Sequence, residues 1–476
     1  MRRRALLGMG VVGLAGAATC SWWSWEPQPR PDLVALTGRQ TRQVVPANVE
    51  SELWAVLRVT VDEGADEERP PVHVGLVIDT SASMAGPPLE AAKAAAIELV
   101  GALQDGDRLT VVTFDSRAAL VVPSVALDDD ARDEARRLLA EIEARGTTDL
   151  AAGLQLALGD LLPHTGEGRV TRLVLLSDGV PNDASAIPSA VAQASGAGIT
   201  VTALGFGLDY DETLLASVAQ QTGGTFHFLE APADLVPIFR EENLRLQGVE
   251  ARELVLSLTT GPGVALREVV GHAVALPQPR LYLGLGDLSR GEERVVVVRL
   301  AVGPHRAGAT IELLDAMLTY RDPRTGATMD QDAVFLSAHA EDDATALAQA
   351  IDPELEREIE SAKAAALTLQ AVALSRQGDD ASARDVLQAA APAAAAAAKR
   401  LDDGTLAEQV DDINALVDAL ERADEDDGDE PAPGLASTPG SGGGGPPKTS
   451  GWYRRQAVRR AHGNAMNNFQ ARKNRR

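Results

Sequence analysis

The chain has 476 residues, which is too long for one ordinary hydrophobic core and predicts two to four domains. Its hydrophobic fraction of 45% is typical of globular proteins. Its formal net charge of −25 argues against nucleic acid as a partner of the protein body, and a single cysteine excludes an internal disulfide.

The first 25 residues are typical of an export signal or a membrane anchor. Three arginines at positions 2–4 precede an uncharged, largely apolar run over residues 5–25. A basic segment followed by an apolar segment is the layout of a secretory leader. Arg3 and Arg4 also resemble a twin-arginine signal, although the polar residue that usually precedes the arginines is missing. We therefore expect residues 1–25 to direct export.

Three fates of this leader stay open. Cys20 lies where a lipoprotein signal has its acylated cysteine and is the candidate for lipidation, although residues 17–19 make a poor lipobox. The run over residues 5–25 is also long enough to span a bilayer uncleaved, and small residues at 15–17 would allow cleavage and free secretion. These fates predict a location in the cell envelope, membrane-anchored or as a lipoprotein, in the periplasm or at the cell surface. A cytoplasmic protein with an apolar leader is the remaining alternative.

Strands dominate the start of the body, and an alternating pattern follows. Residues 33–71 contain two or three predicted strands, such as the run over 54–61. From residue 74 onward, apolar strands alternate with helical segments, beginning with a strand at 74–78. This alternation predicts a doubly wound, mostly parallel sheet with helices on both faces. We assign residues 72–245 to this α/β domain.

Five polar side chains in this domain form a pattern typical of a cation site. Three follow an apolar strand in the spacing Asp-x-Ser-x-Ser, one is a threonine at the start of a predicted helix, and one is an aspartate after a second apolar strand. These candidate metal ligands are Asp79, Ser81, Ser83, Thr148 and Asp178. Ligands bind at the carboxyl ends of strands in open α/β sheets, and hard cations prefer oxygen ligands. The simpler alternative is that the serines cap a helix and the last aspartate lies in a turn.

The pattern resembles the von Willebrand factor type A family and its metal-ion-dependent adhesion site, and the resemblance covers roughly residues 72–245. It implies a Rossmann-like α/β fold. It also implies that the three hydroxyls bind Mg²⁺, or Mn²⁺ or Ca²⁺ in its place, while the two aspartates lie nearby and often act through water. One position of the ion then stays open for a carboxylate from a protein ligand. The departures from the family pattern are Ala82, where glycine is common, and Asp149, where asparagine is common.

After the α/β domain, the apolar period changes to two. Residues 249–340 contain alternating runs separated by Gly and Pro turns, which predict an antiparallel β-sandwich. The strands in residues 33–71 would be marginal as an isolated unit. We infer that they complete the sandwich and that the α/β domain is inserted into it. Bacterial exported proteins with this arrangement resemble the chain along its whole length.

The last third of the chain changes composition twice. Residues 341–423 are alanine-rich and predict a small α-helical domain, and residues 424–447 are typical of a disordered linker because they are acidic and then rich in Pro, Gly and Ser. Residues 448–476 are a basic C-terminal tail with nine Lys or Arg and no acidic residue. The tail could dock on the acidic body, on anionic lipid or on another protein, and docking on the body is the simplest of these.

The sequence contains no recognisable catalytic set, so we expect no enzymatic activity. The seven histidines are scattered without a spacing that suggests zinc, and His73 is expected to be an ordinary edge residue. The expected function is a metal-dependent protein-binding module, for adhesion or scaffolding, in the bacterial cell envelope. It would bind an acidic group of a partner through a divalent cation. The alternatives are a partner subunit of an ATP-driven chelatase- or chaperone-like complex and a structural surface protein with a vestigial metal site.

Overall fold

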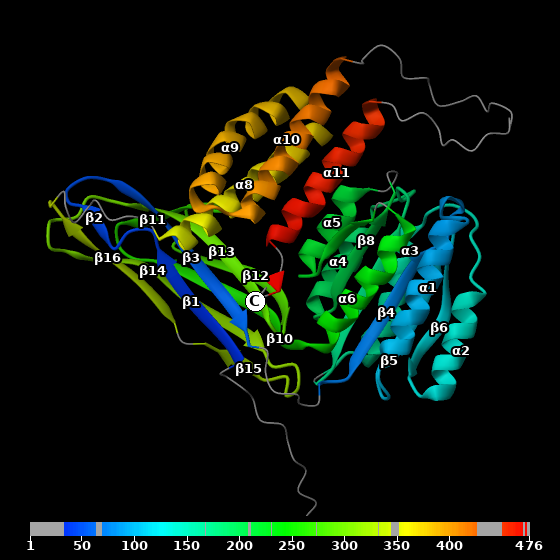
Figure 1. Ribbon diagram of the computed structural model, residues 1–476. Coiled ribbons are helices and arrows are strands. Elements are labelled where there is room, and N and C mark those ends of the chain that lie inside the picture. The colour runs from blue at the N-terminus through cyan, green and yellow to red at the C-terminus, as the bar shows by residue number, and fades with distance from the viewer. Residues whose placement is uncertain are drawn as a thin grey trace, which may run out of the picture.

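The computed structural model describes residues 33–62, 69–166, 168–207, 211–229, 231–272, 274–331, 333–343, 352–425, 450–469 and 472–473. These residues form an α/β domain, a β-sandwich and a helical region (Figure 1). The expected export signal with Cys20 and most of the expected linker lie outside the described residues. Among the described helices, none is both long and apolar enough to cross a membrane.

The α/β domain is built on a six-stranded sheet in the order β6-β5-β4-β7-β8-β9. The bounds are β4 Val72–Asp79, β5 Arg108–Phe114, β6 Ala118–Ala126, β7 Val170–Ser177, β8 Thr200–Phe206 and β9 Phe226–Leu229. All neighbours pair in parallel except β5 and β6. Every residue of the central strands β4 and β7 is buried, as expected for parallel strands that helices cover on both faces.

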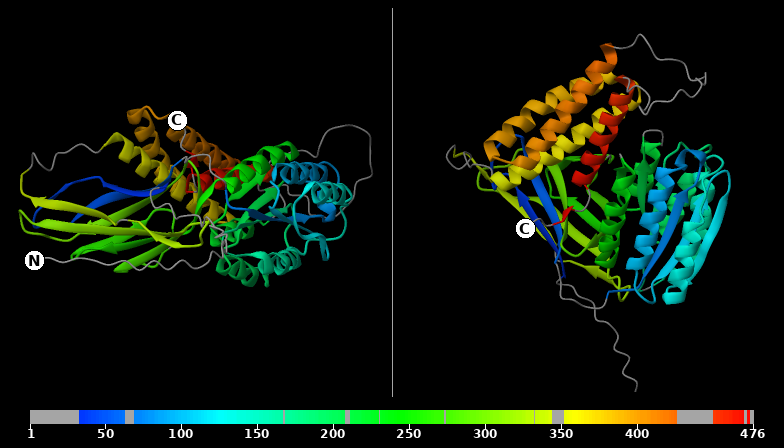
Figure 2. Two further views of the ribbon diagram at one scale, coloured as in Figure 1. Left: turned by 90° about the horizontal axis from the view of Figure 1, so that it is seen from below. Right: turned by 45° about the vertical axis from the view of Figure 1, so that its right-hand side comes forward.

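Helices cover both faces of this sheet (Figure 2). One face packs against α1 Pro87–Ala102, α2 Asp129–Ala140 and α6 Leu235–Gln247, and the other against α3 Leu150–Leu161, α4 Ile187–Gly196 and α5 Glu212–Gln221. The alternation of strand side chains fixes the two cores: Leu76 and Ile78 of β4 point to the first, and Val77 points to the second. The predicted doubly wound fold is confirmed.

The sandwich consists of two sheets that enclose one apolar core. The first sheet has the order β1 Val34–Gln40, β3 Ser51–Val61, β13 Glu292–Val302 and β11 Val264–Val269. The second has the order β12 Arg280–Ser289, β10 Val249–Thr260, β14 Thr310–Arg321, β16 Val334–Glu341 and β2 Val44–Pro46, and β15 Thr328–Asp330 pairs with β14. Because β3 pairs with β13 from Ser51↔Val302 to Thr60↔Glu293, the strands that precede the α/β domain belong to the sandwich that follows it. The inferred insertion is therefore correct.

The helical region contains α8 Pro353–Arg376, α9 Asp380–Leu401, α10 Gly404–Glu425 and α11 Ser450–Phe469. Leu355 and Ile359 of α8 pack on the outer face of the first sandwich sheet. The basic C-terminal segment forms α11, which lies between the other helices and the α/β domain (Figure 1). Arg454 of α11 forms an ion pair with Asp380 of α9, so this segment docks on the body of the same chain.

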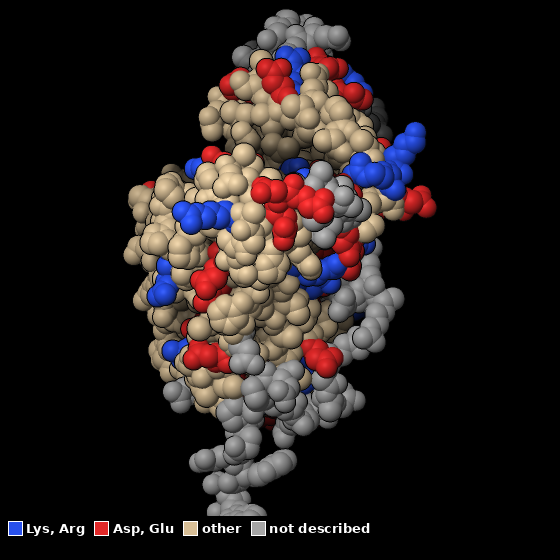
Figure 3. Space-filling model, turned by 90° about the vertical axis from the view of Figure 1, so that its left-hand side faces the viewer, with Lys and Arg blue, Asp and Glu red and all other residues tan. Residues whose placement is uncertain are grey.

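The far end of the sandwich, turned away from the α/β domain, carries Lys, Arg, Asp and Glu side chains interspersed among other residues (Figure 3). A short strand near the C-terminus, β17 Arg472–Lys473, pairs with β13. Three 3₁₀ turns complete the described elements: η2 Ala82–Met84, η3 Leu162–His164 and η4 Pro232–Asp234.

Candidate metal centre

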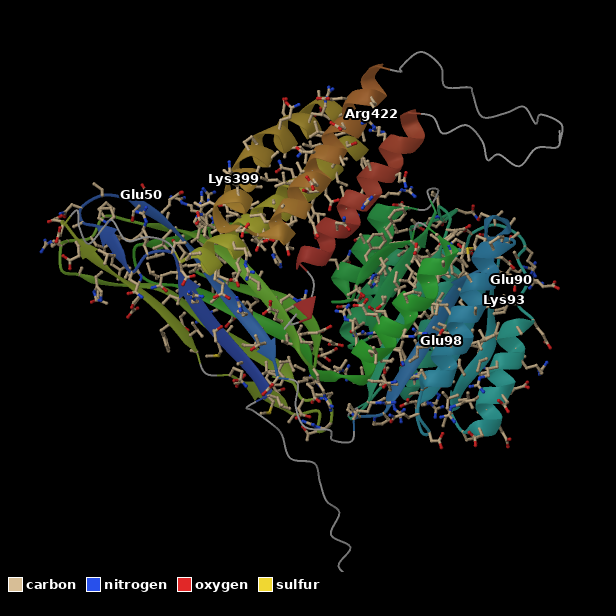
Figure 4. All side chains as sticks on the ribbon, in the orientation of Figure 1. Glu50, Glu90, Lys93, Glu98, Lys399 and Arg422 are labelled. Carbon is tan, nitrogen blue, oxygen red and sulfur yellow. The ribbon has the colours of Figure 1, made fainter. Side chains whose placement is uncertain are left out.

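The two candidate aspartates lie side by side because their strands are neighbours. Asp79 is the last residue of β4, and Asp178 follows the last residue of β7. The two strands pair in parallel up to Ile78↔Leu176. Both carboxylates therefore meet at the carboxyl edge of the sheet, where α1 also begins. In Figure 4, Glu90 and Lys93 mark this end of α1, and Glu98 lies further along the helix toward the opposite edge.

The turn after β4 holds Asp79 and Ser81 in a fixed arrangement. The backbone N–H of Ser81 donates to Asp79 Oδ1 at 2.8 Å. Ser177, the last residue of β7, donates its hydroxyl to Asp79 Oδ2 at 2.7 Å. Both carboxylate oxygens of Asp79 are therefore oriented by the protein. Sequence reasoning missed Ser177, although its position directly before the Asp-Gly pair was a usable signal.

The two serines and Asp178 form a compact group of oxygens. Ser83 donates its hydroxyl to Asp178 Oδ1 at 2.7 Å, and the Ser81 hydroxyl lies 3.4 Å from the same oxygen. The two serine Oγ atoms are 3.1 Å apart. This geometry brings three candidate ligands from two strand ends within hydrogen-bond distance of one another.

The loop before α3 brings Thr148 to the same group. The backbone of the turn after β4 bonds to this loop, since Arg145 N donates to Thr80 O at 2.6 Å and Ala82 N donates to Gly146 O at 3.2 Å. Gly146 has a φ of +73°, and a Cβ there would lie 2.6 Å from Ser116 Oγ, so this close approach requires glycine.

Thr148 lies against the backbone beside Asp178. A Cβ on Gly179 would approach Thr148 Oγ1 to 2.8 Å, so glycine at 179 leaves the space that the hydroxyl uses. Asn182 N also donates to Thr148 O at 3.0 Å. The next residue, Asp149, caps α3 by accepting from Ala152 N, which gives this departure from the family pattern a structural role.

Only one member of the group is exposed. Ser83 is open to solvent, while Asp79, Ser81, Thr148 and Asp178 are buried. The buried oxygens would therefore bind an ion on its protein side, and another molecule would approach the ion from the side of Ser83.

Burial changes the protonation of both carboxylates. It raises the pKa of Asp79, and it raises the pKa of Asp178 to about 6, because taking a carboxylate out of water disfavours its charged form. The described partners of the two groups are hydroxyls and backbone N–H groups, and none of the described Lys or Arg residues forms an ion pair with either. Two adjacent buried carboxylates without a cationic partner fit a divalent cation.

The donor set also indicates which kind of cation fits. Among the described residues, no group of three or more His, Cys, Asp or Glu suits a metal ion. Two carboxylates with three hydroxyls are oxygen ligands only, which suits Mg²⁺, Mn²⁺ or Ca²⁺ rather than zinc.

The expectation that His73 is an ordinary edge residue is wrong. His73 lies inside β4, which begins at Val72 and is one of the two central strands of the sheet. Its side chain is fully buried. Its Nε2 shares a hydrogen bond with Thr110 Oγ1 at 3.1 Å, and burial lowers its pKa to about 3. It lies at the opposite end of β4 from Asp79 and takes no part in the candidate metal centre.

Comparisons with known proteins match the α/β domain to a family. The model of the von Willebrand factor type A domain matches residues 73–241. An uncharacterised protein of Synechocystis sp. is 30% identical over 288 residues, which span 57% of this chain and 67% of that protein. The uncharacterised protein YfbK of Escherichia coli is 24% identical over 41% of this chain and 35% of its own length. Inter-alpha-trypsin inhibitor heavy chain H4 of Sus scrofa is 31% identical, but only 18% of its length is covered.

Two solved structures share the fold. A von Willebrand factor type A protein from Catenulispora acidiphila superposes with a TM-score of 0.65 at 21% identity over 82% of this chain and 89% of that chain. The ArnB paralog VWA2 from Sulfolobus acidocaldarius gives a TM-score of 0.56 at 17% identity over 82% and 95% of the two chains. Both matches extend well beyond the α/β domain, so the shared fold includes more than that domain.

Proposed function

The chain belongs to the von Willebrand factor type A family, and on that premise we propose that it is a metal-dependent protein-binding module of the bacterial cell envelope. Domains of this family are generally protein-interaction modules. The proposal adds that a divalent cation at the candidate metal centre binds an acidic group of a partner protein.

The observation that carries the proposal is the pair of buried carboxylates, Asp79 and Asp178, that face hydroxyls and lack a cationic partner among the described residues. In the proposed complex, Ser81, Ser83 and Thr148 hold Mg²⁺, or Mn²⁺ or Ca²⁺, directly. The bound ion supplies a Lewis-acid position that accepts a further oxygen ligand. Because hydroxyls are neutral, the ion keeps enough positive charge to attract a carboxylate from outside.

The surface beside the centre also suits a protein partner. Val180, two residues after Asp178, is 59% exposed, and such an apolar side chain can contact the partner next to its carboxylate. Arg145 lies in the loop that carries Thr148, and its guanidinium is held by Asp115, with Nε and Oδ2 2.9 Å apart. An apolar contact and a cation beside the ion would both favour an acidic protein segment over a free carboxylate.

The envelope location rests on the sequence of residues 1–25. An apolar leader with Cys20 supports a module that is tethered to the membrane by its N-terminus and presents its α/β domain to other envelope proteins. In this proposal the N-terminal segment supplies a tether and the α/β domain supplies a metal-dependent contact.

A pull-down from solubilised membranes tests the proposal. Wild-type chain should capture one or more proteins in millimolar Mg²⁺ and release them in EDTA. Ser83→Ala removes an exposed candidate ligand with little effect on the core and should abolish capture, whereas Ser337→Ala, an exposed serine on β16, should not. Capture that is equal in Mg²⁺ and EDTA would contradict the proposal, and Mg²⁺-dependent capture of an ATPase would favour the alternative of a chelatase-like complex.

A further inference from the structure

A polar pocket lies between the α/β domain and the sandwich. Its volume is about 200 Å³, and the side chains that matter for its chemistry are Arg169, Thr171, Arg252, Glu253, Arg321 and Asp322. Arg169 and Thr171 lie at the start of β7, so the pocket and the candidate metal centre are at opposite ends of the same strand. Eight residues of strand separate them, or roughly 26 Å. The pocket is therefore a separate site.

Three hydrogen-bond donor atoms on side chains that line the pocket have no acceptor among the described residues. They are Thr171 Oγ1, Arg169 Nη1 and Arg252 Nε. Thr171 is almost completely buried, and an unpaired buried hydroxyl is costly because its hydrogen bonds to water are lost without replacement. Unpaired donors from both domains that line one pocket point to a ligand that accepts hydrogen bonds.

The charges of the pocket leave an excess of positive charge. The carboxylate of Asp322 binds the backbone of its own turn, where Oδ1 accepts hydrogen bonds from Arg324 N at 2.8 Å and from Thr325 N at 3.0 Å. Glu253 is paired with Arg321 at 3.3 Å, with Arg252 Nη2 further away at 3.8 Å. Among the described residues, none forms an ion pair with Arg169.

The surroundings of Arg169 reinforce this excess. Burial and the neighbouring Arg108 lower the pKa of Arg169, because both disfavour its charge, while Asp107 acts in the opposite direction. Asp107 is itself bound to Arg69 through both carboxylate oxygens, at 2.9 and 2.5 Å. A second anion near Arg169 would therefore be stabilised.

The backbone beside the pocket is strained at Glu253. Glu253 has a φ of +53°, which is unusual for a residue with a side chain, and it lies in a bulge where the pairing of β10 shifts register. This bulge lets Arg252 donate to Arg169 O at 2.9 Å and to Gly198 O at 2.8 Å, across the domain boundary. Strain that is kept in place by such contacts is common at binding sites.

We propose that this pocket binds a small oxyanion of the phosphate class through Arg169, Thr171 and Arg252. A tetrahedral oxyanion accepts several hydrogen bonds from different directions, and guanidinium groups match its geometry. Because its ligands come from both domains, the bound anion stabilises the α/β domain against the sandwich. The anion is a free ion or a phosphoryl group on a larger molecule, and the two sources share this chemistry.

Thermal unfolding of the whole chain tests the proposal. Inorganic phosphate should raise the unfolding temperature above that in chloride of equal ionic strength, by about 1–2 °C once phosphate exceeds its dissociation constant tenfold. The rise should be the same in EDTA, because the candidate metal centre is not involved. No rise beyond that in chloride would overturn the proposal.

Two pocket variants and one control locate the binding. Thr171→Val keeps the shape of the side chain and removes the unpaired hydroxyl, so it should raise the unfolding temperature without phosphate and lose most of the phosphate-dependent rise. Arg169→Gln should lose the rise as well, whereas Arg137→Gln, an exposed arginine on α2, should retain it. A rise that is unchanged in both pocket variants would place the anion elsewhere and overturn the assignment.

A comparison of ligands separates the sources. O-phosphoserine should give a larger rise than inorganic phosphate if the phosphoryl group belongs to a protein, and an equal or smaller rise if the ligand is a free ion. Either result supports a phosphate site. Citrate or acetate at equal ionic strength should give no comparable rise, and an equal effect of these carboxylates would contradict the phosphate class.

Discussion

Asp79 and Asp178 have the same side chain but different roles in the candidate metal centre. Asp79 has both oxygens occupied by protein donors, from Ser81 N and Ser177 Oγ. Asp178 faces the two serine hydroxyls near the surface. Asp79 thus orients the turn after β4, and Asp178 is the carboxylate that is closest to the exposed side. This division gives each residue a separate test.

Ser177→Ala should destabilise the protein. The substitution leaves Asp79 Oδ2 buried without its hydroxyl donor, and an unsatisfied buried oxygen costs about 1–3 kcal/mol. Urea unfolding at pH 7 without metal measures the loss, with Ser337→Ala as the control for an exposed serine. A free energy of unfolding equal to that of wild type would show that the bond does not hold Asp79.

His73 should make the protein sensitive to acid. Burial lowers its pKa in the folded chain to about 3, compared with 6.5 in the unfolded chain. Below pH 6.5 His73 is protonated in the unfolded chain but stays neutral in the folded chain. The contribution of neutral His73 to the free energy of unfolding is therefore complete above pH 6.5 and is lost as the pH falls toward 3. The slope approaches about 1.4 kcal/mol per pH unit inside this window.

The comparison of wild type with His73→Asn isolates this contribution. The raised pKa values of Asp79 and Asp178 act with the opposite sign in acid, but they are common to both proteins. The free energy of unfolding, measured from pH 7 to pH 4.5, should fall more steeply in wild type. Parallel curves would mean that His73 is not held neutral.

At the scale of elements, much of the fold could be predicted because local patterns determine it. The apolar runs of β4 and β7 are buried on both faces, and such runs identify parallel strands. The insertion of the α/β domain followed from strands that had no partner before it. The order of strands in the sandwich could not be predicted, since β2 pairs in parallel with β16 almost three hundred residues later.

The candidate site was predictable in its members but not in its contacts. The spacing of Asp79, Ser81 and Ser83 indicated one turn after one strand. The hydrogen bond from Ser177 to Asp79 joins two strand ends, so it depends on the pairing of β4 with β7. Thr148 reaches the group through backbone contacts of its loop, which also depend on the tertiary fold.

The basic segment at the C-terminus shows the same limit. Its charges indicated an association with the acidic body but not a helix in a specific place. In the structure, Val458, Ala461 and Ala465 of α11 are buried, and Arg459 donates to Gly207 O at the end of β8. Helix α11 therefore connects the helical region with the edge of the α/β domain.

Arg454→Ala should loosen α11. Its Nη2 lies within hydrogen-bond distance of Ser375 O, Ser375 Oγ and Asp380 Oδ1, at 2.9, 3.1 and 2.7 Å. Loss of these partly buried, charge-assisted bonds should cost about 1–3 kcal/mol. Hydrogen exchange of α11 backbone amides should become faster in this variant.

Arg460→Ala on the same helix is the matched control, because Arg460 is exposed. Its exchange rates should equal those of wild type. Equal rates in wild type and in the Arg454 variant would show that other contacts determine the position of α11.

At the scale of the whole molecule, charged contacts join the inserted α/β domain to the sandwich. Arg245 of α6 pairs with Glu292 of β13 at 2.7 Å, and Thr200 of β8 donates to Asp287 of β12 at 2.9 Å. These contacts lie away from the carboxyl edge of the parallel sheet. The candidate metal centre therefore lies at the end of the domain opposite these contacts, and its exposed residue Ser83 lets a partner approach it.

The central claim is that this end of the α/β domain binds a divalent cation through Asp79, Ser81, Ser83, Thr148 and Asp178. Titration of the whole chain with Mn²⁺, followed by electron paramagnetic resonance of the free ion, tests it directly. We predict one saturable site that Mg²⁺ displaces, that Asp178→Asn abolishes and that Asp133→Asn, at an exposed position on α2, leaves intact. Mn²⁺ binding that is absent in wild type, or that is unchanged in the Asp178 variant, would contradict the account.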